Sequence, residues 1–66
     1  MKVTKEQTGI YKVELNGKVY KIAKKEFSSE WEVFEVKING YGNEETEWEN
    51  TLVSKKSAIL WLNLNK

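Results

Sequence analysis

Apolar and polar residues alternate on both sides of Asn16 and Gly17, which indicates a hairpin of two antiparallel strands. Asn-Gly is the preferred pair for a two-residue type I′ turn, because both central positions need positive φ. A turn of this length also sets the register, so that Val13 faces Tyr20 on a mostly apolar face. The turn chemistry and the alternation therefore agree on strands over about 9–15 and 18–24.

Residues that favour strands also flank a second, glycine-containing turn. They predict two further strands, over about 31–38 and 44–52. If Ile38 faces Glu44 across the turn, Trp48 lies on one core face with the apolar residues of the preceding strand. The opposite parity would instead set Trp31 against Leu52. We favour the first register and keep the second open.

Ser54 is a good helix N-cap, and the segment after it holds neither Pro nor Gly, which predicts a helix over about 55–64. The order of elements predicts a single α+β domain over residues 1–66. Its architecture is an antiparallel β-meander of three to four strands with one C-terminal α-helix packed on one face. The predicted core is Tyr11, Val13, Leu15, Tyr20, Ile22, Phe34, Val36, Ile38, Trp48, Ala58, Ile59, Trp61 and Leu62.

The predicted helix is more apolar than one buried face requires. Ala58, Ile59 and Leu62 belong to a stripe that can cover the sheet, whereas Leu60 and Leu64 project from roughly the opposite side. Leucines exposed in this way are typical of an interface, so we expect the chain to form a homodimer through them. In the alternative interpretation, both leucines pack against the first eight residues.

Several residue types are missing, and their absence narrows the chemistry. The chain has no Cys, His, Asp, Arg or Pro, which excludes thiol nucleophiles, zinc–thiolate sites and the usual general base near neutral pH. A domain this small also offers little room for a cleft. We therefore predict no enzymatic activity, no cofactor and no metal site.

The ends of the chain carry no targeting pattern. The N-terminal segment is polar, and the longest apolar run covers only residues 58–62, so we predict neither a signal peptide nor a membrane span. Cytoplasmic residence without membrane association is the expectation. The use of Lys and Asn without Arg would suit an AT-rich genome, such as that of a phage or a marine microbe.

Charge is unevenly distributed along the chain, although the net charge is only +1. Residues 1–25 hold seven lysines and two glutamates, 26–49 hold eight glutamates and one lysine, and 50–66 hold three lysines. The central segment suggests a patch for a basic partner, or a mimic of a phosphate backbone. Two alternatives are a solvated outer sheet face and a contact with the basic hairpin of another subunit. The patch residues are Glu35, Glu45, Glu47 and Glu49.

The lysines suggest a second function, the binding of nucleic acid. Lys12 and Lys21 lie directly opposite each other in the predicted hairpin, an arrangement that costs stability and that a bound phosphate would relieve. The alternative interpretation is that these lysines only keep the surface soluble. The candidate contacts are Lys12, Lys18, Lys21, Lys24, Lys25, Lys55 and Lys56.

The segment from Thr51 to Leu62 resembles the end of the arm-type DNA-binding domains of phage integrases. In that family, three strands precede a helix that opens with Thr-Lys-Lys-Glu-Ala. Lys55, Lys56 and Ala58 match this opening, whereas serines replace the threonine and the glutamate. The resemblance implies a sheet followed by a helix, and DNA binding with the sheet in the major groove. The glutamate-rich strands would repel phosphates, so a self-associating module that binds protein is our first hypothesis and nucleic-acid binding our second.

Overall fold

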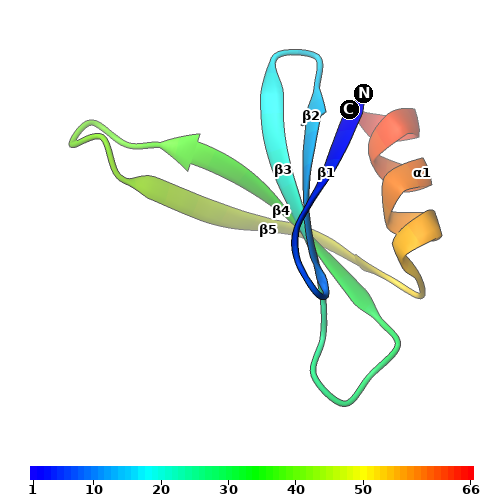
Figure 1. The fold of residues 1–66 in the computed structure, drawn as a ribbon. Coiled ribbons are helices and arrows are strands. Elements are labelled where there is room, and N and C mark those ends of the chain that lie inside the picture. The colour runs from blue at the N-terminus through cyan, green and yellow to red at the C-terminus, as the bar shows by residue number, and fades with distance from the viewer.

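A computed structural model describes all 66 residues as one antiparallel sheet with a helix on one side (Figure 1). Its five strands are hydrogen-bonded in sequence order and lead into the helix at the C-terminus. The fold is therefore α+β, with one more strand than the three to four predicted. The elements are β1 (Lys2–Gln7), β2 (Ile10–Leu15), β3 (Lys18–Lys24), β4 (Trp31–Ile38), β5 (Glu44–Leu52) and α1 (Lys55–Asn65).

The β2–β3 hairpin has the predicted register. Val13 pairs with Tyr20, and Lys12 pairs with Lys21. The turn residue Asn16 has a φ of 52°, and the glycine after it has a φ of 78°, as a type I′ turn requires. The local chemistry of two residues thus determines how two strands align.

The additional strand is β1, which pairs with β2 from Lys2 opposite Glu14 to Gln7 opposite Ile10. All six of its residues are exposed to solvent. A strand without a buried face needs no alternation of apolar and polar residues, so the sequence pattern could not reveal it. Backbone hydrogen bonds to β2 hold it at the edge of the sheet.

A β-bulge reconciles the two registers considered for β4 and β5. Near the turn, Ile38 pairs with Glu44, as the favoured register requires. The register then shifts between Val33 and Phe34, and at the far end Trp31 pairs with Leu52. One extra residue in β5 changes which side chains share a face, so each parity holds along part of the hairpin.

The hydrophobic core lies between α1 and one face of the sheet. Seven residues are buried there: Val13, Leu15, Tyr20, Ile22, Val33, Ala58 and Leu62. All of them except Val33 belong to the predicted core, and three further predicted residues, Tyr11, Ile59 and Trp61, are partly buried against this cluster. A single cluster therefore joins the sheet to the helix.

Four predicted core residues lie instead on the opposite face of the sheet, which we call the outer face. Ile22 pairs with Val33, so Val33 shares the buried face and the next residue points away from it. Phe34 and Val36 are half-buried, whereas Ile38 and Trp48 are 65% and 56% exposed. The predicted register of these residues was correct, but the assignment of their face to the core was wrong.

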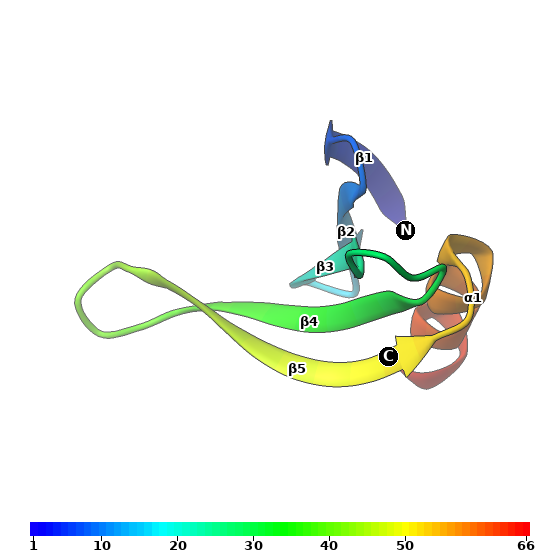
Figure 2. The ribbon, with the colours of Figure 1, turned by 90° about the horizontal axis from the view of Figure 1, so that it is seen from below.

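Helix α1 begins at the predicted cap. The side chain of Ser54 accepts a hydrogen bond from the backbone N–H of Ser57 at 3.1 Å. The helix then packs against β3, β4 and β5. Figure 2 shows that the β4–β5 hairpin extends well beyond α1, as a projecting arm. We define the arm as residues 34–48.

Leu62 and Leu60 lie on the same helix and provide a matched test of the core. Leu62 is fully buried, whereas Leu60 is 55% exposed. Leu62→Ala should lower the free energy of unfolding by about 2–5 kcal/mol, because it leaves a cavity in the core. Leu60→Ala should change it by less than about 0.5 kcal/mol. Urea unfolding followed by circular dichroism compares the two, and equal effects would contradict this placement of the helix.

Candidate interaction surfaces

The paired lysines Lys12 and Lys21 lie on the outer face, and each has a carboxylate nearby. The Lys12 ammonium is 3.9 Å from a carboxylate oxygen of Glu14. The Lys21 ammonium is 3.5 Å from Glu6 of β1 and 3.8 Å from Glu44 of β5. Neighbouring glutamates therefore offset the repulsion between the two lysines without any ligand.

Two other candidate lysines also form ion pairs. Lys18 follows the hairpin turn and lies 4.0 Å from Glu35, measured between the ammonium and a carboxylate oxygen. Lys25 lies in the β3–β4 connection, 3.7 Å from Glu30. These pairs are partly exposed, and pairs of this kind contribute little to stability. They do lower the local positive charge that a phosphate would encounter.

The remaining candidate lysines lie elsewhere. Lys24 is exposed at the end of β3, and its backbone N–H donates to the carbonyl of Gly9. Lys55 places its ammonium 4.2 Å from the centre of the Tyr11 ring, a cation–π contact on the helix side of the sheet. Lys56 is exposed on α1. The seven lysines are thus divided among the outer face, the β3–β4 connection and the helix side.

Three of the four acidic patch residues share one face of the arm. Glu35 pairs directly with Glu47, and Glu45 is on the same face. The Lys37 ammonium donates to Glu47 at 3.0 Å, and the Asn39 amide donates to Glu45 at 2.8 Å. The hydrogen bond to Glu47 raises the pKa of Lys37.

Glu49 differs from the other three because it is the unpaired residue at the bulge of β5. Its carboxylate lies 2.6 Å from the ammonium of Lys66, and this contact raises the pKa of Lys66. The contact ties the end of α1 to β5. Glu49 therefore serves a structural contact, apart from the acidic face of the arm.

Leu60 and Leu64 are 55% and 73% exposed on the side of α1 that faces away from the sheet. An open groove beside Leu60 is lined by Met1, Ile59 and neighbouring polar side chains. The N-terminus thus comes close to Leu60 but leaves both leucines largely uncovered. We call the surface formed by Met1, Ile59, Leu60 and Leu64 the helix surface.

A second uncovered apolar surface was not expected from the sequence. Phe34, Val36, Ile38 and Trp48 project from the outer face of the arm, where no helix covers them. The alternation of apolar residues along β4 indicated correctly that they share a face. It could not show that α1 packs on the other face, because that depends on how β4 pairs with β3.

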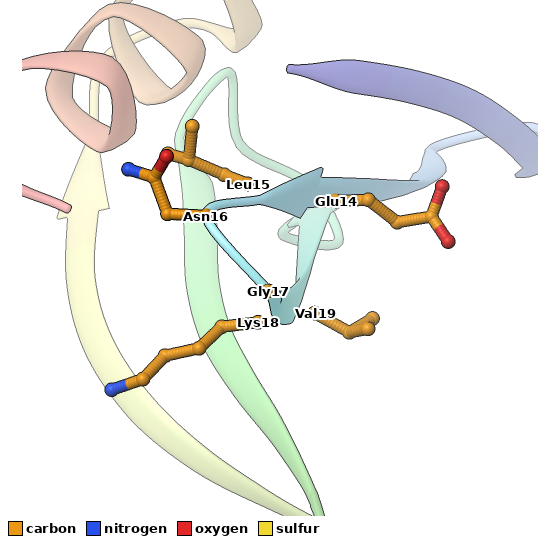
Figure 3. Close-up of a pocket in the computed structure, with 6 residues that line it drawn as sticks. All are labelled: Glu14, Leu15, Asn16, Gly17, Lys18 and Val19. Carbon is orange, nitrogen blue, oxygen red and sulfur yellow. The ribbon is translucent and has the colours of Figure 1, made fainter.

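The hollow at the β2–β3 turn is lined by residues Glu14 to Val19 (Figure 3). Leu15 and Asn16 point to one side of the turn, whereas Glu14 and Val19 point to the other. The Asn16 amide already donates to the backbone carbonyl of Lys66 at 2.9 Å. Polar groups do not converge here, so the hollow lacks the arrangement that orients a small ligand.

No group of three or more carboxylates gathers in a way that could hold a metal ion. The helix is too short to span a membrane. Comparison with models of protein families, with curated proteins and with solved structures gives no match.

Tyr20 provides a test of the helix-side packing. Its pKa is raised above the ordinary value of 10.0, first by burial and then by the negative charge of its cross-strand neighbour Glu35. The folded state holds the phenol proton more tightly than the unfolded chain, so this contribution to stability is complete below pH 10 and is lost as the pH rises further.

We expect the free energy of unfolding of the parent protein to decline above about pH 10. The free energy of unfolding of the Tyr20→Phe variant should decline less steeply over the same range. Tyr41 is 93% exposed, so Tyr41→Phe is the matched control and should follow the parent protein. Urea titrations between pH 8 and pH 11 measure the slopes. Identical slopes for all three proteins would contradict the role given to burial.

Proposed function

We propose that this protein is a small non-enzymatic interaction module that self-associates through the helix surface. One observation carries the proposal: nine large apolar residues are exposed, against seven residues buried in the core. Scattered exposed apolar residues are ordinary, but contiguous groups of them are typical of interaction sites. Leu60 and Leu64 form such a group with Met1 and Ile59.

The size of the domain supports the same proposal. A chain of about 60 residues buries only ~60% of the surface that its unfolded form exposes. The chain has no cysteine for a disulfide, and its surface of 4637 Å² exceeds the ~4,300 Å² expected of a compact monomer of this mass. Burying the helix surface between two copies would add apolar contacts that the isolated chain lacks.

Nucleic-acid binding is the alternative function. The direct pairing of Lys12 with Lys21 on an uncovered face favours it. The carboxylates beside both lysines count against it, because they lower the positive potential that attracts phosphates. We therefore rank this function second and include a duplex in the test.

Sedimentation equilibrium of the parent chain should show reversible self-association. The double variant Leu60→Lys/Leu64→Lys should weaken association through the helix surface on the order of 100-fold, or about 2.7 kcal/mol, because it places four charges in a dimeric contact. The control Ser29→Lys/Val53→Lys adds the same charge at exposed positions outside the helix surface, and should associate like the parent.

Three results would argue differently. A parent chain that stays monomeric at all concentrations would contradict self-association. Unchanged association of the double variant would show that the helix surface is not the contact. Co-sedimentation with a short random-sequence duplex at low salt, lost at moderate salt, would favour the nucleic-acid alternative.

A further inference from the structure

The arm has one charged face and one apolar face. Glu35, Lys37, Glu45 and Glu47 lie on the charged face, and Phe34, Val36, Ile38 and Trp48 lie on the outer face. Alternation of this kind is typical of antiparallel strands that pack one face against another element. Yet no element of the chain covers the outer face, and Ile38 and Trp48 stay more than half exposed. The pattern therefore calls for a covering element from outside the chain.

We infer that the apolar face of the arm packs against the same face of a second copy of this chain. The inference rests on the proposed self-association and adds a second contact to the one on α1. It assigns a role to four apolar residues that neither the core nor the helix surface uses.

The charges on the outer face select the orientation of the second copy. Glu44, near the tip of the arm, is the arm's only charged residue on this face. Lys21 lies at the base of the arm, in the row that pairs with Phe34. Within one chain these two charges already meet at 3.8 Å. A twofold axis near Val36 makes the two arms antiparallel, so the Glu44 row of each arm also lies over the Lys21 row of the other, and each charge gains a further opposite neighbour. Parallel arms would set both Glu44 residues together.

The same arrangement matches the apolar residues. With the axis near Val36, the Trp48 row of one arm lies over the Ile38 row of the other, and the two Val36 residues meet at the centre. Two sheets that pack in this way interdigitate their inner side chains over a layer about 10 Å thick. The polar residue Thr46 also lies near the axis, and the charged residues of the opposite face point away from the contact.

The area that a stable contact requires extends the interface beyond the arm. The arm contains five residues of β4 and five of β5. Strands of that length are about 17 Å long, and two of them are roughly 10 Å wide. Such a ribbon falls short of the ~800 Å² per partner of a standard interface. We therefore extend the contact to the outer faces of β2 and β3, which carry Val19, Lys12, Glu14 and Lys21.

The arm contact and the helix surface lie on opposite sides of the sheet. Figure 2 shows the arm extending away from α1, so one neighbour cannot cover both. Each contact is twofold and self-complementary, so a chain that uses both builds assemblies larger than a dimer. Each contact can then be removed separately.

The first experiment compares four proteins by sedimentation equilibrium. The parent should form species larger than a dimer, whereas Leu60→Lys/Leu64→Lys and Ile38→Lys should each stop at the dimer. The triple variant should be monomeric. Tyr41→Lys is the matched control for the arm, since Tyr41 is 93% exposed at its tip and outside the apolar face.

The second experiment tests the predicted charge contact, in the Leu60→Lys/Leu64→Lys background where only the arm contact remains. Glu44→Lys alone and Lys21→Glu alone should each weaken the dimer roughly tenfold, because like charges then meet twice. An equimolar mixture of these two chains should regain the original affinity as a heterodimer. In the mixture, each chain still carries two like charges at positions 21 and 44, so the 3.8 Å contact within the chain is not restored. Only a contact between the two chains would therefore explain the recovery.

The outcomes separate this inference from the proposed function. Association of Ile38→Lys like the parent, or no recovery in the mixture, would overturn the arm contact and leave self-association through α1 intact. If Leu60→Lys/Leu64→Lys associates like the parent and Ile38→Lys is monomeric, the arm contact is supported and the helix surface is rejected. A monomeric parent would reject both. Binding of a DNA duplex that Ile38→Glu abolishes would overturn the second copy as the occupant. Circular dichroism of each variant verifies that it is folded.

Discussion

One helix can cover only one face of a sheet, and the rest of this structure follows from that limit. Helix α1 has eleven residues and packs on the face that carries Val13, Tyr20 and Val33. A helix is about 10 Å wide, the width of roughly two strands, so it cannot extend over five strands and a projecting arm. Edge strand β1 and the arm therefore stay outside the core. Their stability comes from backbone hydrogen bonds and cross-strand pairs.

The bulge in β5 lets one hairpin serve two surfaces. At its base, Trp31 and Leu52 pair with each other and pack against the core cluster. Beyond the bulge, Phe34 and Trp48 pair on the outer face. Without the extra residue in β5, Trp31 would not pair with Leu52 on the core face while Phe34 pairs with Trp48 on the outer face. The bulge residue Glu49 also contacts Lys66, so the feature that divides the hairpin also holds the end of the helix.

Much of this fold could be predicted from local residue chemistry. Asn16 and Gly17 determine one hairpin, and Ser54 marks the start of α1, because turns and caps depend on a few neighbouring residues. Long-range choices could not be predicted in the same way. Alternation places Val33 and Phe34 on opposite faces, but only the pairing of Val33 with Ile22 decides which of them meets the helix. Strand β1 has no buried face and hence no pattern. For the surfaces, helical periodicity was enough to predict that Leu62 is buried and Leu60 exposed. The ion-pair partners of Lys21 could not be predicted, because they lie on β1 and in the arm.

The uneven charge along the sequence acquires a different meaning in the folded chain. Residues 1–25 are basic and 26–49 acidic, yet four of the seven ion pairs join a lysine of a basic segment to a glutamate of the acidic one. Charge segregation therefore first supports pairing within the chain, and seven of the ten glutamates have a lysine partner. The apolar groups on α1 and on the arm have no such partners within the chain. Because burial of apolar surface is the main driving force of most protein association, these groups, rather than the charges, supply the affinity of the proposed contacts. The few charges on the outer face then determine orientation, since complementary charges contribute more to specificity than to affinity.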